Sequence, residues 1–458
     1  MHAHRGSRRY QQQRIRQQAR TIQSCDFFNL LSGPELLDLL EQQLPPHRER
    51  LFAPTETLSL FMRQVLSSDA SCQAVVNRYA VERLANGLPP CSTSTGAYCK
   101  ARQRLPLALM ESLVRQTGIL TAMRASTKWR WQGRAVKLLD GSTVTMPHTP
   151  ENQARYPQQS TQKPGLGFPI ARVSALLCLS TGAVLDSATG PYCGKSGSEH
   201  ALFAHLLGSL VAGDVLVADR YYCSYVVIAM LQAQGVDVVL QQHQRRITDF
   251  RKGRRLGPRD HLVTWEKPKR CPSWLSQPQY DALPATLLIR EVRVKSKVLV
   301  TTLLSPRQTS KQALGELYVQ RWNVELDLRN IKTTLGLEAL HCMTPQMNQK
   351  EWWVGLLAYN LIRLLMLLCA KHADVLPRQL SFKHTVQLWL VWDHRRPQHD
   401  DGLDILLVLI AQQRVAGRPG RSEPRAVKRR PKSFPLLTEP RRRARARVRR
   451  HGHPKKPK

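Results

Sequence analysis

The sequence predicts a mixed α/β protein in which helical regions lie before and after a middle part built around a β-sheet. Three observations support this fold class. Apolar residues recur at helical spacing up to about residue 128, change to short strand-like runs as far as about residue 312, and then return to helical spacing. With 458 residues, the chain is long enough for two or three domains with a buried core.

The first helical region covers residues 23–128, where Ser and Thr caps and Gly or Pro breaks separate the predicted helices. One of its segments, STSTGAYCKARQRLP, begins with capping hydroxyl groups and carries Lys100, Arg102 and Arg104. A helix of this kind can lie on a phosphate backbone, so we interpret residues 23–128 as a helical DNA-binding domain. A basic face exposed to solvent explains the same three residues equally well.

Residues 129–242 contain strand and helix patterns in alternation. RAVKLLDGSTVTMP alternates like a strand, and ARVSALLCLSTGAVLDSATGPY consists of two strand-like runs joined by a Thr-Gly turn. Then follow a helix (SGSEHALFAHLLGSLVAG), a short apolar strand (DVLVADRYY), a second helix (SYVVIAMLQAQG) and a last strand (VDVVLQQ). This order, three antiparallel strands, helix, strand, helix and strand, resembles that of a ribonuclease-H-like fold.

Residues 243–312 lie between this last strand and the closing helix of the fold. They are basic at first and then strand-like, and we predict that they form a β-rich insertion. The closing helix is LYVQRWNVELDLRNIKTTLGLE, and residues 313–400 contain it together with further C-terminal helices. One of these, WWVGLLAYNLIRLLMLLCA, is interrupted by Asn360 and Arg363. We therefore predict a buried core helix rather than a membrane span.

The charge of the chain, formally +36 at pH 7, favours a polyanionic partner, nucleic acid before membrane. Residues 1–22 hold six arginines and no acid, which predicts a basic flexible arm. Residues 401–458 are predicted to be a basic disordered tail. From Arg414 onward this tail has eighteen Lys and Arg, two acids and seven prolines, a composition that cannot bury a core.

The cysteines and the N-terminus indicate a cytoplasmic protein. The ten cysteines form no CxxC pair and no ordered spacing, which is typical of free thiols in a reducing compartment rather than of a zinc site or a disulfide framework. The N-terminal arginines are not followed by an apolar stretch, so we expect no signal peptide.

Three acidic residues stand where the predicted fold would bring them together. Asp140 ends the first strand, Asp219 ends the fourth, and Glu325 lies on the closing helix. In a ribonuclease-H-like sheet the first and fourth strands are neighbours and the closing helix lies across their ends, so the three carboxylates would meet. Each aspartate alone also fits a local role, Asp140 in an Asp-Gly turn and Asp219 as a helix cap.

Such a group of carboxylates suits chemistry on a phosphodiester. Two divalent cations about 3.5–4 Å apart can stabilise the attacking and the leaving oxygen. Mg²⁺ takes oxygen ligands and is usually held by only a few carboxylates. Without metal, the like charges repel one another and cost stability, which indicates that the grouping serves a function.

The motifs around these acids resemble those of the bacterial insertion-sequence family four DDE transposases, from the first strand to the C-terminal core helix. The matching motifs are LLDGSTV around Asp140, DVLVADRYY around Asp219, and the spacing Y-two-R-three-E-six-K of Tyr318, Arg321, Glu325 and Lys332. Further similar stretches are YPQQSTQKPGLGFPIARV, GPYCGKSGSEH and LLAYNLIRLLM. In that family the β-rich insertion lies between the second Asp and the Glu, as predicted here for residues 243–312.

The resemblance implies a cut-and-paste transposase that nicks transposon terminal inverted repeats and joins the freed 3′-hydroxyls to target DNA. It implies that Asp140, Asp219 and Glu325 hold two Mg²⁺ or Mn²⁺ ions. Tyr318, Arg321 and Lys332 would contact DNA phosphates, and we add Arg329 on the same helix to this set. The expected partners are double-stranded DNA and, on DNA, a second copy of the chain, at the bacterial nucleoid and not at a membrane.

Alternative interpretations stay open. The closing helix can be an amphipathic surface helix with solvated charges, in which Glu325 pairs with Arg329. The chain can also be a catalytically idle DNA-binding protein derived from a transposase, or another ribonuclease-H-like nuclease such as a junction resolvase.

Two details depart from the simplest expectation. Some relatives that form a DNA hairpin hold a flipped base on a tryptophan shortly before the signature helix, but KSKVLVTTLLSPRQ has no aromatic residue here. Trp265 and Trp274 lie earlier in the insertion, where packing is the simpler role. Glu199 opens the first helix of the fold, where ribonuclease H enzymes carry an acid, and we interpret it as a helix N-terminal charge.

Overall fold

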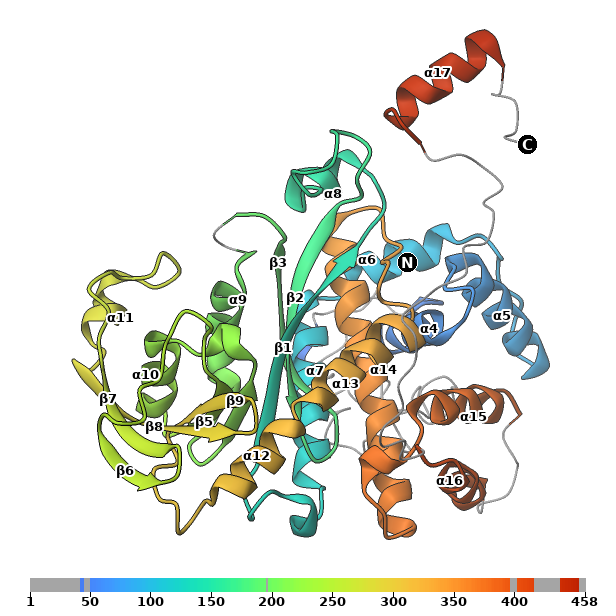
Figure 1. Cartoon of the computed structure of the whole chain (residues 1–458). Helices are drawn as coiled ribbons and strands as arrows, with labels where there is room; N and C mark the ends of the chain where they lie inside the picture. The colour runs from blue at the N-terminus through green and yellow to red at the C-terminus, as the bar shows by residue number, and fades with distance from the viewer. Residues whose placement is uncertain (1–41, 45–49, 195–196, 396–401, 416–436, 453–458) are drawn as a thin grey trace, which may run out of the picture.

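The described residues build a β-sheet whose two faces are covered by helices (Figure 1). The structure is a computed structural model that describes residues 42–44, 50–194, 197–395, 402–415 and 437–452. The predicted mixed α/β class is confirmed. The predicted N-terminal arm, residues 1–22, lies outside the described residues.

The strands of the described residues form one nine-stranded sheet in the order β3-β2-β1-β4-β5-β9-β8-β7-β6. Their bounds are β1 Val136–Thr145, β2 Ile170–Cys178, β3 Val184–Pro191, β4 Val215–Ala218, β5 Asp237–Gln241, β6 Arg254–Gly257, β7 Asp260–Glu266, β8 Thr286–Val294 and β9 Lys297–Thr301. β1 pairs antiparallel with β2 and parallel with β4. The first and fourth strands are therefore neighbours, as the ribonuclease-H-like element order predicts.

The insertion continues this sheet instead of forming a separate one. β9 pairs antiparallel with β5, where Thr301 lies opposite Val239, and β8, β7 and β6 follow outward. The short helix α11 Gln277–Asp281 connects β7 to β8. Since β9 covers the edge that β5 would otherwise expose, the insertion completes the hydrogen bonding of the central sheet on that side.

The two faces of the sheet carry different helices (Figure 1). One face carries α7 Leu107–Met123, α12 Lys311–Val319, α13 Trp322–Arg329 and α14 Pro345–His372, and the other carries α9 Glu199–Leu206 and α10 Tyr225–Ala233. Residues of β1 alternate between these faces, because successive strand side chains point to opposite sides. Leu138 and Val144 join the core under α14, whereas Leu139 joins the core under α9.

Helix α14 lies at the centre of the first face. Its length and composition alone would suffice to cross a membrane, but 94% of its most apolar window is buried inside the protein. Asn360 donates to the carbonyls of Val184 (2.8 Å) and Val114 (3.0 Å), and so connects α14 to β3 and α7. The prediction of a buried core helix is confirmed.

The N-terminal helices are divided between two cores. α4 Pro54–Leu66 and α7 pack in the main core with α14, while α5 Cys72–Ala85 and α6 Gly96–Arg104 form a smaller core with α4. α7 approaches β3 so closely that a Cβ atom on Gly118 would lie 2.1 Å from the carbonyl oxygen of Val184. α7 therefore belongs to the layer that supports the sheet, and a separate domain at residues 23–128 stays a prediction.

The C-terminal part is more ordered than the sequence predicts. After α15 Phe382–Arg395, residues Gly402–Gln412 form α16, with Leu406 and Ile410 buried in the main core. The predicted disordered tail is therefore wrong for this segment, because its apolar residues have helical spacing and its basic composition begins only at Arg414. A further helix, α17 Arg441–His451, lies near the end of the chain.

The remaining elements are short. They are α8 Pro150–Arg155 after β1, the one-turn 3₁₀ helices η2 Thr127–Trp129, η4 Leu207–Ser209, η5 Arg220–Tyr222 and η7 Pro377–Gln379, and the π-helical turn η6 Asn330–Thr334. Two of them, η5 and η6, follow directly on predicted site residues.

Candidate active site

Asp140 lies within β1 rather than at its end. β1 continues beside β2 as far as Thr145, but its pairing with β4 stops at Leu138. Asp140 is therefore the first residue on its face beyond the β1–β4 ladder. Because it alternates with Leu138 and Val144, its side chain lies on the face that α13 covers. The prediction that Asp140 ends its strand is therefore wrong. Its side chain nevertheless lies on the face of the sheet where it can share a site with a residue of α13.

Asp219 directly follows β4, and it alternates with Val217, which belongs to the same core as Leu138. Its Oδ1 accepts the backbone N–H of Tyr221 at 2.9 Å and so caps η5. The capping role considered from the sequence is thus present, and it also fixes the direction of the carboxylate.

The predicted signature helix is broken into three pieces. α12 ends at Val319, α13 begins at Trp322, and the π-helical turn η6 follows α13. The backbone N–H groups of Gln320 and Arg321 bond to carbonyls only three residues back, at 2.9 and 3.1 Å, which tightens the chain at the break. Tyr318 therefore lies on α12 and Glu325 on α13, and the prediction of one continuous helix is wrong.

Arg321 stands at this break and bridges two of the predicted acids. Its Nη1 lies 3.5 Å from Asp140 Oδ2, and its Nη2 lies 2.7 Å from Glu325 Oε1. Strand β1 and helix α13 thus bring together two carboxylates that are remote in the sequence. The guanidinium occupies the position between them that a cation would be expected to take.

The electrostatics bring Asp219 into the same group. Burial raises the pKa of Asp140 to about 6, and the neighbouring carboxylates of Asp219 and Glu325 add to this rise. The backbone N–H of Gly141, at 2.8 Å from Asp140 Oδ1, and the guanidinium of Arg321 oppose it. The ionised form of Asp140 is therefore under-compensated, which is the condition that a bound cation relieves.

The donor atoms suit a hard divalent cation. Three carboxylates supply only oxygen ligands, as Mg²⁺ and Mn²⁺ prefer. No group of three His, Cys, Asp or Glu side chains among the described residues is arranged to hold a metal ion as it stands. The residues present fit the ion chemically, and Arg321 balances part of their charge.

Two of the predicted basic residues, Lys332 and Arg329, line a cavity of about 280 Å³ whose wall includes Asp140 and Glu325. Lys332, on η6, lines this cavity and its Nζ lies 3.5 Å from Glu338 Oε1. Arg329 lines it as well and is exposed. Both cations are therefore next to the carboxylates; Arg329 is open to solvent, whereas Lys332 is only partly exposed and already paired with Glu338.

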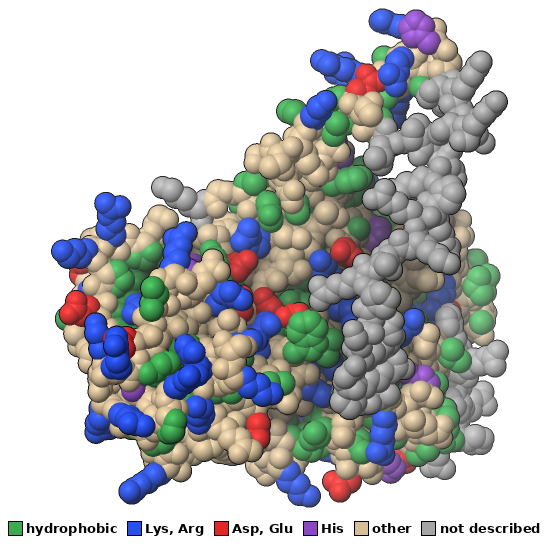
Figure 2. Space-filling model, viewed as in Figure 1, with side chains coloured by type: hydrophobic (Ala, Val, Ile, Leu, Met, Phe, Trp, Pro, Cys, Tyr) green, Lys and Arg blue, Asp and Glu red, His purple; other side chains and the backbone are tan. Residues whose placement is uncertain are grey.

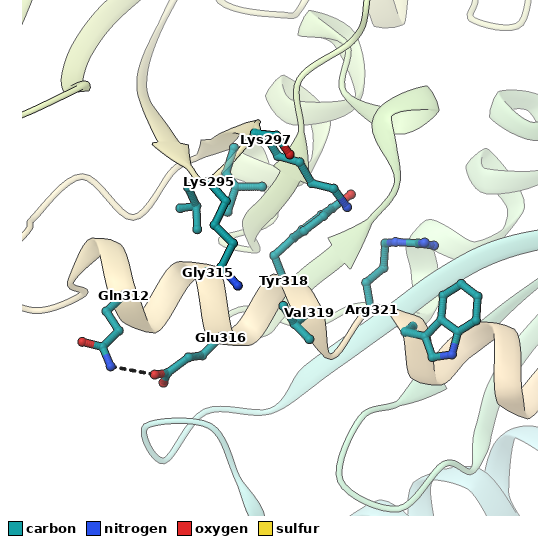
Figure 3. Close-up of a pocket in the computed structure, with 12 residues that line it drawn as sticks. Lys295, Lys297, Gln312, Gly315, Glu316, Tyr318, Val319 and Arg321 are labelled. Carbon is teal, nitrogen blue, oxygen red and sulfur yellow. Dashed lines mark hydrogen bonds between the residues drawn. The ribbon is translucent and has the colours of Figure 1, made fainter. Parts of the chain in front are cut away.

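A second cavity, of about 580 Å³, adjoins Arg321 on the side of α12 (Figure 3). Lys295 and Lys297 from the β8–β9 turn and Tyr318 from α12 point into the same space. No local pattern in the sequence points to these two lysines, because only the fold brings the end of the β8–β9 hairpin beside α12. Trp322, 57% exposed, also lines this cavity.

Tyr318 is itself mostly enclosed. Only 5% of the residue is exposed, its hydroxyl donates to Gln241 Oε1 at 3.2 Å, and the Nζ of Lys297 lies 5.2 Å from the centre of its ring. Burial raises the pKa of Tyr318 to about 12, so the phenol stays protonated. In this structure the residue supports the wall beside Arg321 and its hydroxyl is already engaged.

The three predicted DNA-binding residues of the N-terminal helical region differ in their exposure to solvent. Lys100 and Arg104 are exposed on α6 and line a cavity of about 470 Å³ together with Arg50. Arg102 is buried, and its guanidinium bonds to Gln64 Oε1 at 3.2 Å and lies 4.8 Å from the ring centre of Phe61. The predicted phosphate contact of Arg102 is therefore wrong for this structure, because helical spacing turns it into the small core.

Glu199 lies near the site but on the α9 side of β1, opposite to the face that carries Asp140. It is the first residue of α9, and its carboxyl carbon would lie 3.4 Å from a Cβ atom at Gly141, the neighbour of Asp140. Arg172 pairs with it at 3.2 Å. Burial raises the pKa of Glu199, Arg172 opposes the rise, and Asp219 adds to it.

A buried ion network holds α13 from behind. Asp327 lies two residues after Glu325, is 1% exposed, and pairs with Arg363 of α14 and with Arg378 of η7, the latter at 2.9 Å. Arg378 also donates to the carbonyl of Cys178 at 3.1 Å, at the end of β2. This network ties α13 to α14 and to the sheet, and so fixes the helix that carries Glu325.

The known proteins to which this chain is similar are transposases. The family model described as "Transposase DDE domain" matches residues 131–361, about half of the chain. Transposase InsG for insertion sequence element IS4 of Escherichia coli (strain K12) is 28% identical over 357 residues, which cover 74% of this chain and 77% of InsG. Putative transposase InsZ of the same organism is 27% identical over 223 residues, covering 44% of this chain and 74% of InsZ. The chain therefore belongs to the IS4 family of DDE transposases.

Proposed function

We propose that this transposase cuts DNA at the terminal inverted repeats of its element and joins the freed 3′-hydroxyls to target DNA. The observation that carries the proposal is the meeting of Asp140 and Glu325 around Arg321, with Asp219 close enough to perturb the pKa of Asp140. Acids from two adjacent strands and a helix that covers them supply the ligands that phosphodiester chemistry requires.

Asp140, Asp219 and Glu325 are the residues that would hold two Mg²⁺ or Mn²⁺ ions. Bound there, the ions would stabilise charge on the attacking and leaving oxygens of the phosphodiester. The chain's own contribution is the placement of its side chains. Asp219 keeps its direction through the cap on η5, and the ion network behind α13 holds the helix that carries Glu325.

Arg321 would move from the two carboxylates to a DNA phosphate when the site is loaded. Its guanidinium is the group that compensates Asp140 and Glu325 in this structure, and cations would take over that role. Lys332 and Arg329, on the wall of the neighbouring cavity, would contact adjacent phosphates. Tyr318 would support Arg321, and Lys297 lies beside the ring of Tyr318.

The proposed substrate of the transposase is double-stranded DNA. Lys100 and Arg104 of α6 offer an exposed basic edge to the transposon end, and Lys and Arg side chains are spread widely over the face shown in Figure 2. We further propose a homodimer on DNA, so that two transposon ends are processed together, in the bacterial cytoplasm and at the nucleoid.

The test is the variant Glu325→Gln on a duplex that carries the terminal repeats of the element. With Mg²⁺, strand nicking and joining should fall by about 1000-fold, equivalent to ~4 kcal/mol of transition-state stabilisation, while binding to the duplex persists. Glu266→Gln, an exposed residue of β7, is the matched control and should keep full activity. Wild-type rates in Glu325→Gln would contradict the proposal. A wild-type chain that binds the repeats but never nicks them would instead indicate a catalytically idle DNA-binding protein.

A further inference from the structure

Helix α17, Arg441–His451, is the most strongly charged element of the described residues. Its sequence RRRARARVRRH contains seven arginines and no acid. All seven arginines are exposed, and Ala444 and Val448, one turn apart on the same side of the helix, are half-buried. Figures 1 and 2 show α17 projecting from the body, with basic side chains around it.

The start of α17 is held against the body of the protein. Pro440, the residue before the helix, packs on Gly165, where an added Cβ atom would lie 3.2 Å from the proline ring. Gly165 lies between α8 and β2 with a φ of +79°, so a residue with a side chain is disfavoured there for two reasons. Arg447 Nη2 pairs with Glu439 Oε1 at 3.1 Å and further fixes the first turns.

The helical form of α17 needs a partner. Like charges four residues apart, as at Arg441 and Arg445 or Arg445 and Arg449, destabilise an isolated helix. Arginines in the first turn oppose the helix dipole and those in the last turn, Arg449 and Arg450, are favoured by it, so the dipole does not offset the repulsion. None of its residues is buried, so packing does not offset these costs. Neutralisation by a polyanion removes the repulsion and leaves a favourable helix.

The dimensions and the distribution of charge select the partner. A helix of this length measures about 16 Å, and α-helices of ordinary diameter fit the major groove of B-DNA, about 12 Å wide. Apart from the Ala444–Val448 side, arginines lie on both flanks of α17, where they can reach the phosphates of both strands that border a groove. Arginine forms bidentate bonds to phosphate.

We propose that α17 lies in the major groove of duplex DNA and holds it through the phosphates, independently of sequence and outside the catalytic site. The inference rests on the proposed function only in naming DNA as the polyanion. Because Pro440 packs at the α8–β2 connection, α17 would contact the duplex at a second place, in addition to the candidate active site.

The test measures the salt dependence of binding by the full-length chain to a random-sequence duplex without divalent metal. In one variant Arg441, Arg443, Arg445 and Arg449 are replaced by Gln; in the matched control the same four become Lys. The glutamine variant should reduce the slope of log K against log[KCl] by about 2–4 and lower affinity at least tenfold near physiological salt, because four phosphate contacts release fewer counterions. The lysine variant should keep most of the slope. Since α17 buries no residue, thermal unfolding of both variants should match the wild type.

An unchanged slope in the glutamine variant overturns the inference. So does tighter binding of the wild-type chain to anionic lipid vesicles, or to double-stranded RNA of the same length, than to DNA. The assay uses no metal and no terminal repeat, so a failure of the proposed catalysis leaves its outcome untouched. A failure of the α17 proposal likewise leaves the Glu325→Gln experiment intact.

Discussion

Helix α13 carries two carboxylates in opposite electrostatic surroundings. Asp327 is 1% exposed and is paired with two guanidinium groups, those of Arg363 and Arg378. On the other side of the same helix, Glu325 shares the single guanidinium of Arg321 with Asp140, and Asp219 adds a further negative charge. The first site has more positive charge than negative, and the second has the reverse.

The difference separates structural support from reactivity. A buried carboxylate with two guanidinium partners and further hydrogen bonds has its charge compensated, and removing one of the partners destabilises the fold. A group of three carboxylates with one guanidinium is left short of positive charge, so it costs stability, and the cations that we propose for it would relieve that cost. The compensated pair holds α13 in place, and the under-compensated group has the capacity to bind.

The largest effect is expected at the compensated site. Asp327→Asn should lower the free energy of unfolding by about 3–5 kcal/mol, because two guanidinium groups lose their buried counter-charge. Urea denaturation of the full-length chain measures this. Glu325→Gln, two residues away and with 37% of its side chain exposed, should change stability by less than about 1 kcal/mol and serves as the control. If both variants lost a similar free energy of unfolding, the proposed difference between the two sites would be contradicted.

An intermediate effect of opposite sign is expected for Asp140→Asn in the metal-free protein. The folded-state pKa of about 6 lies above the ordinary value of 3.8, so the protonated form is favoured by folding, and stability is lost as the pH rises through about 6. Asn removes this penalty. At about pH 8 the variant should be more stable by ~1–2 kcal/mol, below the ceiling of about 3 kcal/mol set by the shift. The gain should vanish near pH 4, and a destabilised variant at pH 8 would contradict the reasoning.

The smallest effect is a stabilisation by metal. MgCl₂ at about three times its Kd should raise the Tm of the wild-type chain by about a degree relative to NaCl of equal ionic strength, since a ligand that binds only the folded state stabilises it, by about 0.8 kcal/mol at that concentration. The rise should be largest above pH 6, where Asp140 is ionised, and small below pH 5. Asp140→Asn should lose the response. An equal rise at both pH values would place the cation elsewhere.

Much of this arrangement is legible in the sequence. The alternation around Asp140, the short apolar strand before Asp219 and the helical spacing around Glu325 are local patterns, and each predicts its element without knowledge of the rest. The order of those elements is enough to predict that β1 and β4 are neighbours. The long apolar run with Asn360 and Arg363 likewise predicts a buried helix, which α14 confirms.

Other features depend on contacts between distant segments. The sequence does not reveal that Arg102 turns into a core, that α16 packs beside α14, or that the chain breaks between α12 and α13. Residues of the same type look alike in a local pattern, and only their neighbours in space decide whether they are buried or exposed.

The sequence by itself determined the fold class and the family, and it singled out the three acids that we propose as the site, because local periodicity and motif spacing encode which elements form and which side chains they carry. Only the tertiary structure decided how charge is shared among those side chains. Asp327 and Glu325 are both ordinary acids on one helix in the sequence. Two guanidinium groups meet one of them and a single shared guanidinium meets the other, because electrostatic compensation acts through space between residues that the chain separates by tens to hundreds of positions.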